Sequence, residues 1–318
     1  MISKYKKRLE VFHSLFLELR RDWNAESHVV VPYALLSSPP PCETLIFLHI
    51  PKTAGTTLFE LIKVICRANG KLNLRVAVKS NVPPVLTVPG WNGAWGDVNN
   101  YSVQELSRQS IISGHFPFGI DEKLTQSSSY VTLLRDPVDR EISSFNHHFQ
   151  LGYFKSSDSI DMLLSNNQIM DNPQTRMIAG EKFCKEVRCS ERTFLKAKEN
   201  LRSRFLIVGV TEEFNEFLAA LLALLKWPAV EYTERRVTEL KLIQSISDVT
   251  RGELEQFHSF DMKLYQFVKN NWRDWLVSYI DFENLSKKRQ EVLKIPWHSR
   301  LTRRYSLYST DFDSKLIR

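Results

Sequence analysis

The sequence predicts an α/β fold in which a mostly parallel central sheet carries helices on both faces. Short apolar runs alternate along the chain with longer segments of helical periodicity, which is the order that βαβ units produce. The first run, residues 44–50, is apolar on consecutive positions, as in a parallel strand buried on both faces. A length of 318 residues with 43% hydrophobic and 25% charged residues is ordinary for a globular protein with a sizeable core.

The N-terminal part is expected to precede the sheet. Residues 1–23 have apolar side chains at helical spacing and predict an amphipathic helix, after which comes the Pro-rich connector "SSPPPCET". We expect this helix to pack on the body of the protein, with contact to a membrane surface as the alternative. The predicted division is an N-terminal helix and connector at 1–40, a main domain at 41–285 and a basic extension at 286–318.

The main domain begins with the strand at 44–50, then a loop and a helix at about 57–68. Residues 80–100 are rich in Gly, Pro, Asn and Trp and predict a long ordered loop with little regular structure. Further short apolar runs predict strands at 110–115, 130–134 and 205–210.

Helices are predicted after the last two of these strands. The segment "VDREISSFNHHF" has helical periodicity and follows the turn at Asp136-Pro137, which preorganises a helix start. In "TEEFNEFLAALLALLKW" we expect Thr211 to be the N-cap, with Glu212 and Glu213 at the positive end of the helix. From about residue 250 onward the pattern is helical, notably in "ELEQFHSFDMKLYQFVKNNWRDWLVSYI".

The net charge is +7, and basic residues gather near the chain ends in "KYKKR", "KKRQEVLK" and "RLTRRY". This balance favours an anionic partner, such as a nucleotide, an acidic glycan, a nucleic acid or a membrane surface. A solvated basic face is the simpler interpretation of these runs. No segment approaches the roughly 18 apolar residues of a membrane-spanning helix, so we expect no transmembrane segment.

The chain has four cysteines, without the spacing of a zinc site or of a disulfide scaffold. Cys184 and Cys189 flank "KEVR" and could close a small disulfide loop in an oxidising compartment, or stay as free thiols in the cytosol. Both alternatives are open. The predicted strand ends carry no clear metal carboxylate, and we expect no metal site.

The segment "HIPKTAGTT" lies where the first strand gives way to a helix. Unsatisfied N–H groups and the helix dipole favour an anion at such a helix start. Gly55 would let the chain approach a bound oxygen, and Thr56 and Thr57 add hydroxyl donors. Lys52 adds a mobile positive charge, but it precedes the glycine, whereas the Walker motif places lysine after it. The segment predicts a phosphate or sulfate site of another kind.

A second candidate site is "LLRDPVDREISSF". Arg135 stands at the carboxyl end of an apolar strand, where open α/β sheets bind ligands, and Ser143 lies about two turns into the next helix. An arginine fork with a hydroxyl suits a terminal phosphate, although a structural salt bridge is the alternative for Arg135. Two such receptors on neighbouring strand ends predict a ligand with phosphates at both ends of one nucleoside.

These two motifs carry a family resemblance. "HIPKTAGTT" resembles the 5′-phosphosulfate loop, and "RDPVDREISSF" the 3′-phosphate motif, of sulfotransferases that use 3′-phosphoadenosine 5′-phosphosulfate (PAPS). Three further segments, "SGHFPFG", "NPQTRMIAG" and "LIVGVTEEF", are similar to the glycan branch that includes the heparan sulfate 2-O- and 6-O-sulfotransferases and their bacterial relatives. The motifs follow in the order of that branch and cover roughly residues 45–226.

The resemblance implies a P-loop-nucleotide-hydrolase-like sulfotransferase fold at 41–285. It implies in-line transfer of a sulfuryl group, without a metal, from PAPS to a hydroxyl of a glycan or glycoside, leaving adenosine 3′,5′-bisphosphate (PAP). His115 would be the base and Lys52 would neutralise the leaving group. The remaining donor-binding residues would be Thr53, Ala54, Gly55, Thr56 and Thr57 at the 5′-phosphate, and Arg135 and Ser143 at the 3′-phosphate.

The resemblance also suggests acceptor and adenine contacts. Arg176, with Asn172 and Gln174, would lie on the acceptor side, because an arginine can clamp a sugar carboxylate or sulfate. A surface salt bridge is the alternative for Arg176. Arg235 and Arg236 are the candidates for adenine contacts.

Animal enzymes of this branch carry an N-terminal membrane anchor, whereas we expect none in this chain, which begins at Met1 with an amphipathic pattern. We therefore expect a cytoplasmic enzyme, with the Golgi lumen as the alternative if the chain is a piece of a longer protein. The acceptor, a glycan, a small glycoside or a lipid-linked sugar, is open, and we expect no nucleic-acid partner. The competing functions are a small-molecule kinase with an atypical phosphate loop and a non-catalytic binder of nucleotides or polyanions.

Overall fold

The computed structural model describes residues 28–29, 43–69, 85–88, 100–181, 187–225, 229–231, 242–243, 245–276 and 306–308. Of the predicted features, the N-terminal helix at 1–23, the basic runs near both chain ends and Cys184 lie outside the described residues.

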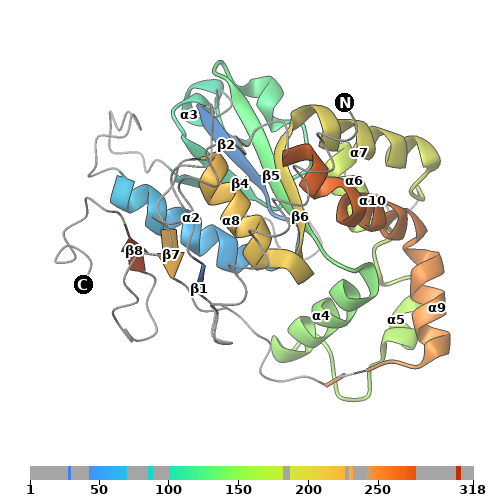
Figure 1. Cartoon of the computed structure of the whole chain (residues 1–318). Helices are drawn as coiled ribbons and strands as arrows, with labels where there is room; N and C mark the ends of the chain where they lie inside the picture. The colour runs from blue at the N-terminus through green and yellow to red at the C-terminus, as the bar shows by residue number, and fades with distance from the viewer. Residues whose placement is uncertain are drawn as a thin grey trace, which may run out of the picture.

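Five parallel strands form the central sheet, in the order β3-β4-β2-β5-β6 (Figure 1). The first strand of the sheet in the chain, β2 (Thr44–Leu48), lies in its middle. β3 (Val85–Val88) and β4 (Ile111–Gly114) lie on one side of it, and β5 (Ser128–Leu134) and β6 (Phe205–Val210) on the other. The chain therefore reverses its direction of winding at β2, which makes this strand the topological switch point of the sheet.

The consecutive apolar residues of the strands account for their burial. Every residue of β2 and β4 is buried, as are the last five of β5 and of β6. Such strands need other elements packed on both faces of the sheet. Burial of each Leu, Ile or Phe side chain then contributes about 1.5–3 kcal/mol of transfer free energy, which exposure to water would lose. The predicted mostly parallel α/β fold is confirmed.

Helices supply this cover. α2 (Gly55–Asn69) follows β2, and α7 (Glu191–Arg204), α8 (Phe214–Leu224) and α10 (Ser259–Leu276) all contact β6. In Figure 1, α2 and α8 lie in front of the sheet, and α6, α7 and α10 lie beyond its β6 edge. α6 (Pro173–Ala179) packs on α7 and α10, and its buried Met177, Ile178 and Ala179 belong to the same hydrophobic core as the strands of the sheet.

A second, smaller core lies beside the sheet. α4 (Pro137–Gln150), α5 (Ile160–Ser165) and α9 (Asp248–Phe257) enclose it, and Figure 1 shows these helices standing apart from the strands. Its buried side chains are Val138, Phe145, Ile160, Leu163, Ile169 and Leu254. Because α4 begins directly after β5, this core anchors the helix that carries the predicted 3′-phosphate motif.

The remaining described elements are short. They are α3 (Val103–Ser107), the 3₁₀ turns η2 (Ile120–Lys123) and η3 (Thr211–Glu213), and a three-stranded antiparallel sheet of β1 (His28–Val29), β7 (Ala229–Glu231) and β8 (Ser306–Tyr308). β1 and β8 come from the predicted extensions at 1–40 and 286–318, whose boundaries stay a prediction.

Several predicted elements need correction. β3 lies inside the segment 80–100, for which a loop with little regular structure was expected. Thr211 is not an N-cap, because its hydroxyl donates to the Leu134 carbonyl (3.0 Å) and a 3₁₀ turn separates it from α8. The helical pattern after residue 250 is two helices, α9 and α10, which are separated at His258.

Cys189 is a free, buried thiol, whereas Cys184, with which a disulfide was considered, lies outside the described residues. Burial raises the pKa of the thiol to about 12, so it stays protonated at neutral pH. None of the helices in the described ranges combines the length and apolar composition needed to cross a membrane.

Candidate active site

The predicted chemical groups meet at one edge of the sheet. β2 pairs in parallel with both β4 and β5, so the carboxyl ends of the three strands lie next to one another. His115 follows β4, the phosphate loop of residues 49–54 follows β2, and Arg135 follows β5. Ligands of open α/β sheets bind at this position, beside the switch point.

The backbone of the phosphate loop is unusual. Lys52 (φ 69°) and Ala54 (φ 61°) are in the left-handed region, which residues with a Cβ rarely adopt. Left-handed residues in alternation with others turn successive N–H groups toward one concavity, which suits an anion. Leu58 N–H donates to the Ala54 carbonyl (3.3 Å), so the helix α2 continues directly from this loop.

Thr53 stabilises the phosphate loop through a hydrogen bond within it. Its side chain is 1% exposed and its hydroxyl donates to the Ile50 carbonyl (2.9 Å). The expectation that Thr53 holds the 5′-phosphate is therefore limited to its backbone, because the hydroxyl proton already has a partner. Thr57 is buried, and Thr56 is half-buried at the start of α2.

Gly55 makes room for a side chain. A Cβ at this position would lie 2.1 Å from Cδ2 and 2.3 Å from Nε2 of His49. Non-bonded heavy atoms do not approach one another this closely in a packed protein. The space next to Gly55 was predicted to admit a bound oxygen; in the structure the imidazole of His49 occupies it.

His49 in turn positions His115. The His115 Nδ1 lies 2.5 Å from the His49 carbonyl oxygen, and the two ring centroids are 4.4 Å apart. His49 also stacks on Phe47 with centroids 5.2 Å apart and an interplanar angle of 13°. Because a carbonyl can only accept, Nδ1 carries the proton and Nε2 carries the lone pair.

This tautomer is the one that a general base needs. Burial lowers the pKa of His115 below its ordinary value, and the hydrogen bond to the His49 carbonyl opposes this shift in part. The imidazole is therefore neutral at pH 7.

Arg135 connects the two predicted phosphate receptors. Its guanidinium Nη1 donates to the Lys52 carbonyl (3.2 Å), so the side chain lies against the phosphate loop. The helix α4 begins just beyond it, with Pro137 in the first turn and the Asp136 carboxylate accepting the N–H groups of Val138 and Asp139 (3.0 Å each). The predicted helix start at Asp136-Pro137 is confirmed.

Ser143, the other predicted residue of the 3′-phosphate motif, is half-buried on α4. Within the described part of the chain no hydrogen bond joins it to Arg135. Its contact with a phosphate stays a prediction.

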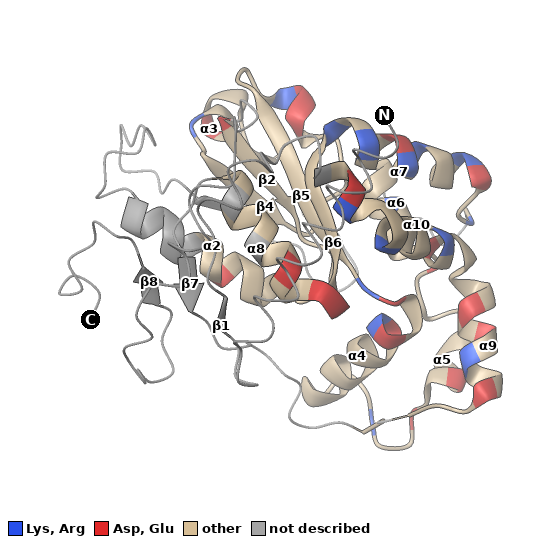
Figure 2. Ribbon diagram, viewed as in Figure 1, with Lys and Arg blue, Asp and Glu red and all other residues tan. Residues whose placement is uncertain are grey.

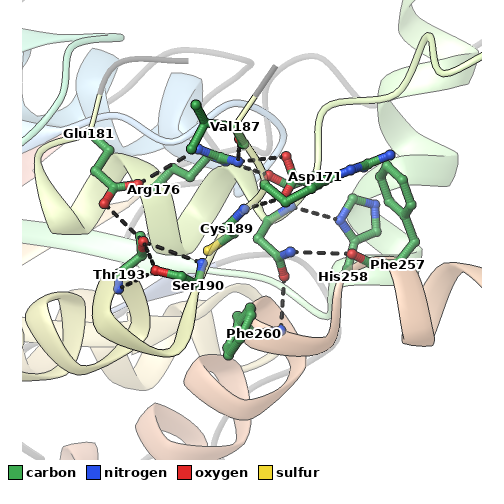
Figure 3. Close-up of polar contacts among 12 residues, drawn as sticks. Asp171, Arg176, Glu181, Val187, Cys189, Ser190, Thr193, Phe257, His258 and Phe260 are labelled. Atoms are coloured by element: carbon green, nitrogen blue, oxygen red, sulfur yellow. Dashed lines mark hydrogen bonds and ion pairs between the residues drawn. The ribbon is translucent and has the colours of Figure 1, made fainter. Parts of the chain in front are cut away.

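Arg176 is a scaffold residue and not a surface clamp. It is 1% exposed, and its guanidinium donates to the Asp171 carbonyl (3.0 Å), the Asp171 carboxylate (2.8 Å) and the Val187 carbonyl (2.5 Å) (Figure 3). Nη1 also lies 3.6 Å from the Glu181 carboxylate. These partners satisfy the buried charge, and the predicted contact with the acceptor is corrected accordingly.

Asn172 and Gln174 are equally buried, at 3% and 0% exposure. The Asn172 side chain donates to the Phe257 carbonyl (3.2 Å) and accepts the N–H groups of Phe260 and Asp261 (2.9 Å each). The Gln174 amide bonds the backbone of Arg135. We therefore assign both residues to the framework behind the site, in place of the predicted acceptor contacts.

The predicted adenine contacts Arg235 and Arg236 lie outside the described residues. Over the described ranges, no three His, Cys, Asp or Glu side chains are placed to share a metal ion. Figure 2 shows basic and acidic residues interspersed on α7 and α9.

Comparison with known proteins identifies the family. The profile of the galactose-3-O-sulfotransferase family matches residues 9–292. A heparin sulfate O-sulfotransferase of Drosophila melanogaster is 25% identical over 272 residues, which are 78% of this chain and 73% of that protein. Human heparan sulfate 2-O-sulfotransferase 1 is 23% identical over 261 residues, 71% of each chain.

Mouse heparan-sulfate 6-O-sulfotransferase 3 is 25% identical over 281 residues, 72% of this chain and 57% of that protein. The resemblance of the motifs to PAPS-dependent sulfotransferases is thus confirmed by matches over most of the chain. The chain belongs to the galactose-3-O-sulfotransferase family and is a sulfotransferase.

Proposed function

We propose that this sulfotransferase moves the sulfuryl group of PAPS to a hydroxyl group of a glycan or glycoside. Family membership supports the reaction, and the relatives described above are named for sulfation of heparin or heparan sulfate, which are glycans. The observation that carries the proposal is the meeting of His115, the phosphate loop and Arg135 at neighbouring strand ends.

The residues present fit the donor. PAPS has a phosphate at each end of its nucleoside, and the chain offers two receptors in contact through the bond from Arg135 to the Lys52 carbonyl. The left-handed residues of the loop and the start of α2 suit the 5′-phosphate. In this proposal the backbone of Thr53 to Thr57 and the Lys52 ammonium hold the 5′ end, and Arg135 with Ser143 holds the 3′ end.

The transfer step assigns one task to each group. The acceptor oxygen forms a bond to sulfur while the bond from sulfur to the bridging phosphate oxygen breaks, and PAP leaves. The hydroxyl proton passes to Nε2 of His115, which is the lone-pair nitrogen. Lys52 neutralises the charge that develops on the leaving phosphate. In-line placement of acceptor and donor supplies much of the remaining rate enhancement, and we propose that no metal takes part.

The experiment is transfer of labelled sulfate from PAPS to a panel of acidic polysaccharides, neutral glycans and small glycosides. We expect wild type to label at least one acceptor, and His115→Ala to abolish labelling while it still binds PAP. Lys52→Ala should lose turnover and bind PAP more weakly. His148→Ala is the matched control, because this histidine on α4 packs against Tyr153 and Phe154 and should not affect transfer. Full activity of His115→Ala would remove His115 as the base.

A further inference from the structure

One buried amide holds the backbone of Arg135. Gln174 Oε1 accepts the Arg135 N–H (3.0 Å), and Gln174 Nε2 donates to the Arg135 carbonyl (2.9 Å). Gln174 is 0% exposed, so these bonds form away from water. Arg135 lies where the β5 ladder ends and α4 has not begun, and its backbone groups need partners from elsewhere.

Gln174 is itself held at the start of α6. The N–H groups of Gln174 and Thr175 donate to the carboxylate of Asp261 on α10 (3.1 and 2.7 Å). In return, Asn172 Oδ1 accepts the N–H groups of Phe260 and Asp261 at the start of α10 (2.9 Å each). Each helix start is thus capped by a side chain of the other, and both carboxylate and amide are buried.

These contacts form a continuous support for one side chain. Asp261 fixes the first turn of α6, Gln174 of that turn fixes the backbone of Arg135, and the Arg135 guanidinium reaches the Lys52 carbonyl. An arginine whose backbone is already fixed loses less conformational freedom when its guanidinium binds an anion.

We propose that Gln174 is a positioning residue for recognition of the donor's 3′-phosphate. It acts through Arg135, which it holds at the end of β5 in the orientation that the phosphate requires. This inference rests on the proposed function, because it takes PAPS as the donor and Arg135 as the receptor of its 3′-phosphate.

The test compares two ligands that differ only in the 3′-phosphate: PAP and adenosine 5′-monophosphate (AMP). Calorimetric titration measures both dissociation constants for wild type and for Gln174→Met, which keeps the side-chain length but removes both hydrogen bonds. We expect wild type to prefer PAP, and Gln174→Met to weaken PAP binding about tenfold while AMP binding is unchanged; tenfold is the loss expected for about 1.4 kcal/mol.

A second variant keeps the proposal testable if Gln174→Met does not fold. At a pH high enough to ionise the new carboxyl, Gln174→Glu retains an acceptor for the Arg135 N–H but loses the donor to the Arg135 carbonyl, so its preference for PAP should fall between those of wild type and Arg135→Ala. The matched control is Gln109→Met. Gln109 is also buried (3% exposed) and its Nε2 donates to the Glu105 carbonyl (3.0 Å), but it precedes β4 at the opposite edge of the sheet. Its preference should equal that of wild type.

The double variant Arg135→Ala/Gln174→Met separates positioning from general stability. If Gln174 acts through Arg135, the double variant binds PAP as weakly as Arg135→Ala alone. Additive losses, equal losses for PAP and AMP, or an unchanged preference in the Gln174 variants would overturn the positioning role. A wild type that binds PAP no better than AMP would instead refute the proposed donor, so the two failures are distinct.

Discussion

His115 is the residue on which the proposed chemistry depends most directly. Its Nδ1 proton is committed to the His49 carbonyl, and burial lowers the pKa of the ring. Because only the neutral ring accepts a proton, kcat/KM should rise with pH through an apparent pKa below the ordinary histidine value of about 6.5 and then level off. A pH–rate profile measures this. A profile that falls as pH rises through this range would contradict a histidine base.

Gly55 is the second residue at which the structure predicts the effect of a substitution. In Gly55→Ala the new Cβ would collide with the His49 ring, which forces the ring off its place against His115. We expect a loss of about 1–3 kcal/mol of folding stability, as for other overpacked sites, together with reduced sulfate transfer.

The double variant Gly55→Ala/His49→Ala provides the control, since it removes the ring that collides. Chemical denaturation should show that it regains stability relative to Gly55→Ala. If the double variant is as unstable as the single one, the contact with His49 is not the reason for glycine at this position.

Arg176 stabilises the helix α6, whose start supports Arg135. Removal of one partner of a buried ion pair leaves an uncompensated charge, so Arg176→Ala should lower the free energy of unfolding by about 3–5 kcal/mol. Arg188→Ala is the control, because this exposed arginine donates to the exposed Asn167 side chain (3.1 Å) and lies over the Phe257 ring (5.0 Å), and loss of such surface contacts should change stability by only about 1 kcal/mol. Unchanged stability of Arg176→Ala with a raised KM for the acceptor would restore an acceptor role.

The same elements show what the sequence predicts well. The strand at Phe205–Val210 and the helix start at Asp136-Pro137 follow from local patterns, namely consecutive apolar residues and an Asp-Pro turn. β3 was missed because it lies among turn-forming residues that mask a short apolar run.

The polar framework could not be predicted in the same way. Asn172, Gln174 and Arg176 have the residue types of a ligand-binding site, and only the fold shows that their partners are within the protein. Gln174 meets Asp261 across 87 positions of the chain, and periodicity carries no information about such pairs. The place of Pro173 in the first turn of α6 does indicate a helix start there, but not what caps it.

On the scale of the whole molecule, His258 joins α9, α10 and the residue before α6. It is 0% exposed, its Nδ1 accepts the Asn172 N–H (3.3 Å), and its Nε2 has no hydrogen-bond partner among the described residues. Burial, aided by the charge of Arg140, lowers the pKa of His258 to about 3. The folded protein therefore holds this histidine neutral while the unfolded chain protonates it below about pH 6.5.

The unfolded state thus binds more protons between about pH 3 and 6.5, so stability falls as pH drops through this range. Urea denaturation should give a lower free energy of unfolding at pH 5 than at pH 7.5. His258→Phe should flatten this dependence; the lowered pKa of His115 acts in the same direction, and the raised pKa of the buried Asp261 acts in the opposite one. An equally steep dependence in His258→Phe would show that other groups cause it.

The central claim is that the loop after β2 and Arg135 together hold the two phosphates of a sulfate donor. Thermal unfolding of wild type with added ligand tests it most directly. We expect PAP, in the presence of a chelator, to raise Tm, since a ligand at one hundred times its Kd adds about 2.7 kcal/mol to stability. ATP with magnesium should raise Tm little. A large rise with ATP and magnesium, and none with PAP, would contradict the claim and indicate a kinase.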